Sequence, residues 1–389
     1  MSAGGDETLR AWVALGLAAW SATQPWLQLV TGLGGDALAV FAADDEELAA
    51  AGARRPVKEV LAAAWEESER ALESARRLGL GIASFASDDY PPLLREIPDP
   101  PLVLYWRGRP PVQCGAAVAI VGSRRCSTYG LRVATSLARE VAAAGIVVVS
   151  GLARGIDAAA HRGAMTSGVT AAVLAGGLDR IYPAAHSSLA GSIADHGGWV
   201  LSEQPPGRAP VPRMFPYRNR IITGLARATV VVEAGERSGS LASARHALAQ
   251  GRDLYAVPGP IDSPCSRGTN ALAQEGSYLL TEAADLAATR ELSNLARPQP
   301  RKPAPNVKDF ASLSDAKARM LLAMLQRGGM DLDGLVEGTS LDGGRVLALL
   351  TALEMDGLVE RGWAGTYSCS PLAAGLSLPG AAFGASRHP

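Results

Sequence analysis

Short apolar runs alternate with amphipathic segments through the middle of the chain. Each run is rich in β-branched or small apolar residues and is followed by a loop and, in most cases, a segment with helical periodicity. Continuously apolar strands that alternate with helices are typical of a parallel sheet covered on both faces. We therefore predict an α/β fold with a doubly wound, mostly parallel sheet. The predicted strands are Ala117–Val121, Ile146–Val149, Val169–Leu174, Trp199–Ser202, Thr229–Val232 and Asp253–Val257.

An all-helical module is predicted before the sheet, in residues 1–78. A glycine-rich turn at Thr31–Gly35 separates its central helices. Such a turn can bind phosphate through backbone N–H groups, but the acidic residues that follow it, Asp36 and Asp44–Glu47, would repel an anion. We therefore favour a small structural or docking module, joined to the sheet by a proline-rich connector with a strand at Leu102–Trp106. The predicted helices are Thr8–Trp20, Leu27–Val30, Ala37–Phe41 and Val57–Arg77.

A proline-rich, partly basic linker at 291–312 separates the sheet domain, residues 79–290, from a short domain at 313–371. Three predicted helices and two short strands follow the order of a winged helix, whose third helix usually enters the DNA major groove. Residues 331–345 carry four acidic side chains against Arg345 alone, so we favour a protein-contact role. The tail, residues 372–389, is predicted to be disordered. The helices are Ser314–Gln326, Asp331–Glu337 and Asp342–Met355, and the strands are Leu358–Arg361 and Thr366–Cys369.

The loops that follow the central strands are rich in glycine, serine and arginine. In a doubly wound sheet these loops meet at one edge, where ligands bind. Glycine lets backbone N–H groups approach an anion, and the helix dipole favours negative charge at a helix N-terminus. The pattern predicts a phosphate-binding edge. Its candidate residues are Gly122, Ser123, Arg124, Gly151, Arg154, Gly177, Ser238, Gly239 and Ser240.

A second cationic feature lies between Glu203 and Glu233, where there are five arginines and no acidic residue. Phe215 stands just before a helix-like run within this stretch. Clustered positive charge beside an aromatic ring suits a polyanion whose bases can stack. Taken alone, the stretch fits a buried Phe and solvated arginines equally well. The candidate residues are Arg213, Phe215, Arg218, Asn219 and Arg220.

Composition limits the classes of partner. The formal net charge is −1, so any anion site must be a local patch rather than a property of the whole chain. The four cysteines have no zinc-site or redox spacing, which indicates free thiols in a reducing compartment. The first residues do not resemble a signal peptide, and no apolar run is long enough to span a membrane. We expect a soluble, cytoplasmic protein without a cofactor or metal.

No reactive constellation stands out. The histidines have no metal-ligand spacing, and Asp157, Asp179 and Glu233 are expected to cap helices or to pair with arginines. One enzyme hypothesis remains as an alternative: Gly235–Ser240 resembles the Pro-Gly-Gly-x-Gly-Thr loop of nucleoside-monophosphate phosphoribohydrolases. Those enzymes carry a glutamate shortly after the loop, and Leu241–Arg245 has none. A third possibility is a scaffold whose terminal modules bind proteins.

Several motifs together resemble the DNA-processing protein A family, also called DprA or Smf. They cover about residues 90–290. The flanking modules also resemble family members, as a sterile-alpha-motif-like or helix-hairpin-helix-like N-terminal domain and a C-terminal winged helix. The motifs are Tyr90–Leu94, Asp99–Pro101, Leu104-Tyr105, Ile120–Arg124, Ser150–Asp157, Phe215–Arg220, Ser238–Ser240 and Val257–Gly259.

The resemblance implies an extended Rossmann fold that binds single-stranded DNA, protects incoming DNA and delivers it to the recombinase RecA during natural transformation. It also implies a homodimer through the Rossmann domain and no catalytic turnover. The residues carried over as phosphate donors are Gly122, Ser123, Arg124 and Gly151. Phe215 is carried over as the base-stacking residue, and Arg213 as a further phosphate contact.

Overall fold

The computed structural model describes residues 3–19, 22–53, 57–289, 292–293, 324–325, 328–339, 341–355, 358–362 and 366–370. The chain divides into two compact units, Met1–Arg297 and Pro298–Pro389. The predicted linker, first winged-helix helix and tail lie almost entirely outside the described residues. Among the described residues, no helix combines the length and the apolar character needed to cross a membrane.

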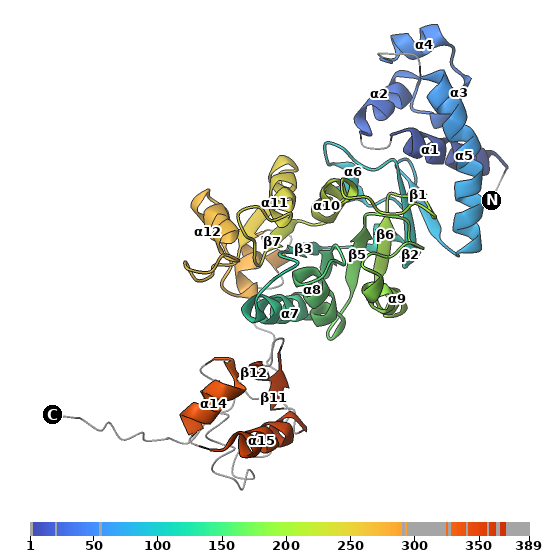
Figure 1. Ribbon diagram of the computed structural model, residues 1–389. Coiled ribbons are helices and arrows are strands. Elements are labelled where there is room, and N and C mark those ends of the chain that lie inside the picture. The colour runs from blue at the N-terminus through green and yellow to red at the C-terminus, as the bar shows by residue number, and fades with distance from the viewer. Residues whose placement is uncertain are drawn as a thin grey trace. The chain divides into compact units, whose positions relative to one another are not determined.

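The larger unit is built on one nine-stranded sheet (Figure 1). Its strand order is β1-β2-β6-β5-β4-β3-β7-β8-β9, parallel from β6 to β9, while β1 and β2 extend it by antiparallel pairing. The predicted doubly wound sheet is confirmed, with strand ends shifted by no more than two residues. The strands are β1 (Gly81–Ser84), β2 (Val103–Gly108), β3 (Ala117–Val121), β4 (Val147–Ser150), β5 (Thr170–Leu174), β6 (Trp199–Ser202), β7 (Ala228–Val231), β8 (Asp253–Ala256) and β9 (Tyr278–Leu279).

Helices cover both faces of the sheet, which explains why its strands are apolar throughout. Alternate residues of β3 show the two cores: Val118 and Ile120 pack with α7 and α8, whereas Ala117, Ala119 and Val121 belong to the core beneath α10 and α11. The helices of this domain are α6 (Pro92–Arg95), α7 (Thr128–Ala143), α8 (Ile156–Met165), α9 (Ser187–Asp195), α10 (Met214–Gly224), α11 (Ser240–Ala249) and α12 (Arg267–Gln274), with 3-10 helices η1 (Pro111–Gln113), η2 (Ala184–His186) and η3 (Ala283–Ala288).

The N-terminal module consists of five helices and shares a core with the antiparallel end of the sheet. Trp12 and Leu15 belong to the same buried cluster as Leu102 and Val103 of the β2 region. The acidic residues after the glycine turn cap helices, because the Asp36 side chain accepts from the N–H of Leu38 at 3.0 Å. The helices are α1 (Ala3–Ala19), α2 (Gln24–Gly32), α3 (Ala37–Ala42), α4 (Asp45–Ala50) and α5 (Lys58–Arg77).

The smaller unit has the helix and strand arrangement of a winged helix. In its described part, two helices pack on a three-stranded antiparallel sheet of order β10-β12-β11. Leu335, Val346 and Leu350 form the centre of its core. Strand β10 replaces the start of the predicted second helix. The elements are β10 (Met330–Asp331), α14 (Leu332–Thr339), α15 (Gly343–Met355), β11 (Val359–Arg361) and β12 (Thr366–Cys369).

Candidate nucleic-acid interface

The predicted loop residues gather at one edge of the sheet. Strands β6, β5, β4, β3 and β7 are neighbours in that order, and all are parallel, so the loops at their carboxyl ends are adjacent. Arg124 follows β3, Arg154 follows β4, and Arg213 comes just before α10. All three side chains are exposed. The edge therefore presents positive charge from separate segments of the chain.

Phe215, at the start of α10, joins two of these loops. The guanidinium carbon of Arg124 lies 5.0 Å from the centre of the Phe215 ring, which is within cation–π range. On another side, Tyr182 meets Phe215 edge-on, with 5.4 Å between ring centroids and 61° between ring planes. Phe215 is consequently only partly exposed. Tyr182 was missed by the sequence analysis, although it stands two residues after Arg180 in a glycine-rich loop of the same edge.

The glycines of these loops are required by close packing. A Cβ atom on Gly122 would lie 2.6 Å from Cγ1 of Ile156, and one on Gly151 would lie 2.6 Å from Nη2 of Arg218. Backbone donors of these loops also form hydrogen bonds within the protein. The N–H of Ser123 donates to the carbonyl of Glu233 at 2.7 Å, and the N–H of Gly177 donates to the carbonyl of Arg208 at 2.9 Å. The two N–H groups expected to face phosphate are thus engaged inside the protein.

The Glu233 carboxylate occupies the N-terminus of α7. It is almost fully buried and accepts hydrogen bonds from Ser127, from the backbone N–H at 2.8 Å and from the hydroxyl at 2.5 Å. Glu233 thus holds Ser127, which is the N-cap residue of α7. The helix N-terminus between β3 and β7 is where a Rossmann fold binds a dinucleotide phosphate. Here a buried negative charge already fills it, and it would repel a phosphate.

Arg218 lies in the interior, contrary to the expectation that it adds surface charge. Its side chain is 6% exposed, and Nη1 donates to the carbonyls of Gly151, at 2.8 Å, and Val173. Burial lowers the pKa of Arg218 to about 10, and nearby Asp157 opposes this effect. Burial likewise raises the pKa of Asp157, against the attraction of Arg218. The guanidinium ties the loop after β4 to helix α10.

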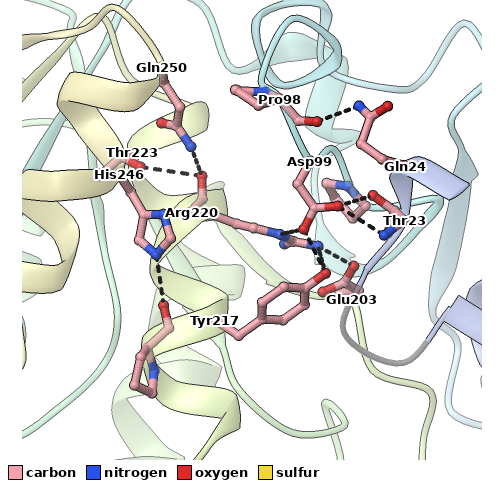
Figure 2. Close-up of polar contacts among 12 residues, drawn as sticks. Thr23, Gln24, Pro98, Asp99, Glu203, Tyr217, Arg220, Thr223, His246 and Gln250 are labelled. Atoms are coloured by element: carbon pink, nitrogen blue, oxygen red, sulfur yellow. Dashed lines mark hydrogen bonds and ion pairs between the residues drawn. The ribbon is translucent and has the colours of Figure 1, made fainter.

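Arg220 is also internal, at the junction with the N-terminal module (Figure 2). It forms ion pairs with Glu203 at 2.6 Å and Asp99 at 3.1 Å, and its Nη2 donates to the Tyr217 hydroxyl oxygen at 2.9 Å. Asp99 in turn accepts from the N–H of Thr23 at 2.9 Å. Burial acts to lower the pKa of Arg220, but Glu203, Tyr217 and Asp99 together raise it well above its usual value.

The expectation of surface charge failed at Arg218 and Arg220 because the carboxylates that meet them are distant in sequence. Asp99 lies in the proline-rich connector, Glu203 marks the limit of the acid-free stretch, and Asp157 follows the β4 loop. A charge count along 204–232 could not include any of them. The proline motif around Asp99 was the one signal that could have indicated this contact, since it belongs to the same set of motifs.

The remaining candidate residues are Asn219, on α10, and Ser238–Ser240, in the turn after β7. Asn219 is partly buried on α10, and its carbonyl accepts from the Thr223 hydroxyl at 3.2 Å. The hydroxyls of Ser238 and Ser240 lie 2.7 Å apart at the start of α11, and Gly239 between them is exposed. This turn follows β7, so it lies beyond β3 from the loop that carries Tyr182.

The buried histidines have structural roles. Leu152 has a left-handed backbone, with φ 57°, in the loop after β4. His161 Nε2 accepts from its N–H at 3.3 Å, and Nδ1 of His186 lies 2.8 Å from its carbonyl oxygen. Burial, together with nearby Arg218, lowers the pKa of His161 to about 3. Within the described parts of the chain, no group of three or more His, Cys, Asp or Glu side chains could hold a metal ion.

Comparison with known proteins identifies relatives. The sequence model described as DNA recombination-mediator protein A matches residues 81–291, and that of the DprA winged helix domain matches 297–365. A putative DNA processing protein DprA of Mycobacterium tuberculosis is 43% identical over 264 residues, 67% of each chain. Protein Smf of Escherichia coli is 45% identical over 197 residues, 50% of this chain and 53% of that one.

A solved structure agrees with the sequence relatives. The X-ray structure of DNA processing protein A from Streptococcus pneumoniae superposes with a TM-score of 0.62 at 35% identity, covering 71% of this chain and 95% of that one. Fold and site together define a DNA-processing protein with a doubly wound α/β domain and a winged helix. The chain belongs to the DNA recombination-mediator protein A family, so the resemblance stated from the motifs is confirmed.

Proposed function

We propose that the protein binds single-stranded DNA along the edge of the sheet where Arg124, Phe215 and Tyr182 meet. This contact carries the proposal because it combines a cation with aromatic rings at an exposed edge. Phosphates attract arginine, and unpaired bases expose ring faces that can stack on an aromatic side chain. Exposed Arg154, in the loop after β4, and exposed Arg213, just before α10, add positive charge to this edge.

The other candidate residues support the interface in two ways. Gly122, Gly151 and Gly177 shape the loops, because each lies against atoms that leave no room for a side chain. Asn219 lies on α10, and Ser238–Ser240 form the turn that starts α11; we propose that these segments add polar contacts with the DNA backbone. Arg218 and Arg220 act indirectly: they hold α10, and with it Phe215, at a fixed place against the loops after β4 and β6.

The same binding edge suits a recombination mediator. We propose that the protein protects incoming DNA and loads RecA onto it in the cytoplasm. This step rests on family membership, and it predicts that RecA-dependent strand pairing on single-stranded DNA accelerates when the protein is added. Loss of acceleration in an Arg124→Ala variant that retains its fold would link loading to the edge. Acceleration of equal size would separate the two activities.

We further propose a homodimer through the Rossmann domain, formed at β9. Among the strands of the described residues, β9 ends the sheet, so one side of its backbone has no neighbouring strand there. Tyr278 and Leu279 of this strand are each more than half exposed. A second copy could add its own β9 and cover these side chains. Sedimentation of Leu279→Asp should shift mass from dimer to monomer, whereas a monomeric wild type would contradict this arrangement.

A competition experiment tests DNA binding itself. Wild-type protein on labelled oligo-dT is challenged with unlabelled single- or double-stranded oligonucleotide of equal length. We expect the single strand to compete at about tenfold lower concentration, because base faces in a duplex are covered by their stacked neighbours. Equal competition would contradict the proposal. Leu248→Ala is a suitable control variant, since this residue is 61% exposed on α11 and has no part in the interface.

A further inference from the structure

Tyr182 is the more exposed of the two rings in the proposed interface. Its side chain lies 55% exposed, whereas Phe215 is partly covered by Arg124 on one side and by Tyr182 on another. A base approaching from solvent therefore meets the Tyr182 ring over a larger area.

The backbone on both sides of Tyr182 is anchored by hydrogen bonds, and its ring packs edge-on against Phe215. Before it, the N–H of Arg180 donates to the carbonyl of Gly177 at 2.9 Å. After it, Pro183 accepts from the N–H of His186, whose imidazole reaches the Leu152 carbonyl. An aromatic surface fixed in place before binding costs less conformational entropy than one that must be ordered by the ligand.

The angle between the rings determines what they can hold. At 61°, the rings of Tyr182 and Phe215 cannot stack on opposite faces of one flat base. They form a corner that suits two successive bases, one on each ring, in a strand that turns between them. Arg124 stands beside the corner. Arg180 precedes Tyr182 by two residues, and its side chain is 60% exposed while its Nε lies 3.7 Å from the Asp179 carboxylate. Both guanidinium groups can contact phosphates of a strand that turns here.

We propose that Tyr182 is a second base-stacking residue, which binds the nucleobase next to the one at Phe215 and favours unpaired over duplex DNA. The inference rests on the proposed function of this edge and adds a residue and a selectivity to it. A duplex cannot present two unstacked faces to the corner without breaking its own stacking. Single-strand preference would then depend on the rings, and overall affinity on the arginines.

The experiment separates bases from phosphates. Wild type, Tyr182→Ala and Tyr182→Phe are titrated with oligo-dT and with an abasic oligonucleotide of the same length and charge. We expect Tyr182→Ala to bind oligo-dT about tenfold more weakly, to bind the abasic strand like wild type, and to keep the same salt dependence. Tyr182→Phe should match wild type, because the ring and not the hydroxyl stacks. Arg124→Ala should weaken both ligands and reduce the salt slope by about 1.

Each result has a distinct meaning. If wild type binds oligo-dT and Tyr182→Ala binds it equally well, this inference fails and the proposed function stands. Equal losses on both ligands would mean that the ring supports the loop and does not stack, which also overturns the inference. Wild type that fails to bind oligo-dT overturns both. Should Tyr182→Ala unfold, Tyr182→Leu, which keeps apolar volume without a ring, gives the same comparison.

Discussion

Two regions of helix α10 show opposite uses of the same residue types. At its N-terminal end, Phe215 packs against exposed Arg124, and the charge faces solvent. One turn further along, Arg218 and Arg220 point into the protein and meet carbonyls and carboxylates. This difference shows that arginines clustered in the sequence do not by themselves form a cationic surface. Partners supplied by distant segments decide which arginines remain available to a ligand.

The interior region should be the more sensitive to substitution. Arg220→Ala would leave Glu203 buried without its countercharge, so we expect a loss of about 3–5 kcal/mol in the free energy of unfolding. Urea denaturation measures it. Arg154→Ala, at an exposed site, is the matched control and should keep wild-type stability. A stable Arg220→Ala protein that no longer binds DNA would instead make Arg220 a direct contact and remove the distinction between the regions.

Substitution of Gly151 tests whether the buried guanidinium of Arg218 can shift to make room for a side chain. A Cβ atom there would lie 2.6 Å from Nη2 of Arg218, so we expect Gly151→Ala to cost about 1–3 kcal/mol in stability. Gly191→Ala is the control, because its Cβ would meet nothing within 4 Å in helix α9 and alanine favours a helix. Equal stability of the two variants, measured by thermal denaturation, would show that Arg218 shifts without cost.

Acid should lower the free energy of unfolding through the buried imidazole of His161, in helix α8. Its pKa is about 3 in the folded protein, against 6.5 when unfolded. The unfolded chain therefore binds a proton that the folded one does not, and the stability held above pH 6.5 is lost as pH falls toward 3. The expected contribution is about 1.4 kcal/mol per pH unit over that window. His161→Gln should flatten the pH dependence by that slope, and parallel curves would contradict the assignment.

Substitutions in the exposed region should have the smallest effects. They should change the affinity for DNA and leave the free energy of unfolding unchanged. Arg154→Ala is expected to weaken single-strand binding by about fivefold at 0.1 M salt and to lower the salt slope by about 1, because one phosphate contact is lost. Its unfolding transition should not change. Binding measured across a salt series provides both values. A slope identical to wild type would place Arg154 outside the path of the DNA.

Local pattern was sufficient for the fold and for part of the interface. Apolar runs such as Ala117–Val121 became central strands with the predicted ends, because a strand buried on both faces must be apolar at every position. The two-residue strand β9 and the antiparallel β1 were not predicted, since neither carries a long apolar run. Arg124 and Phe215 were placed at one edge correctly, because parallel strands carry their following loops to the same side.

By itself, the sequence determined the layered α/β architecture, the family and the sheet edge at which we propose that DNA binds, since these follow from periodicity and from motifs within short segments. Only the tertiary structure decided which arginines face solvent and that Tyr182 stands beside Phe215. The physical reason is that burial and ion pairing depend on partners brought from far along the chain. Asp99 accepts a hydrogen bond from Arg220, which is 121 positions away in the sequence. No local sequence pattern predicts such a contact.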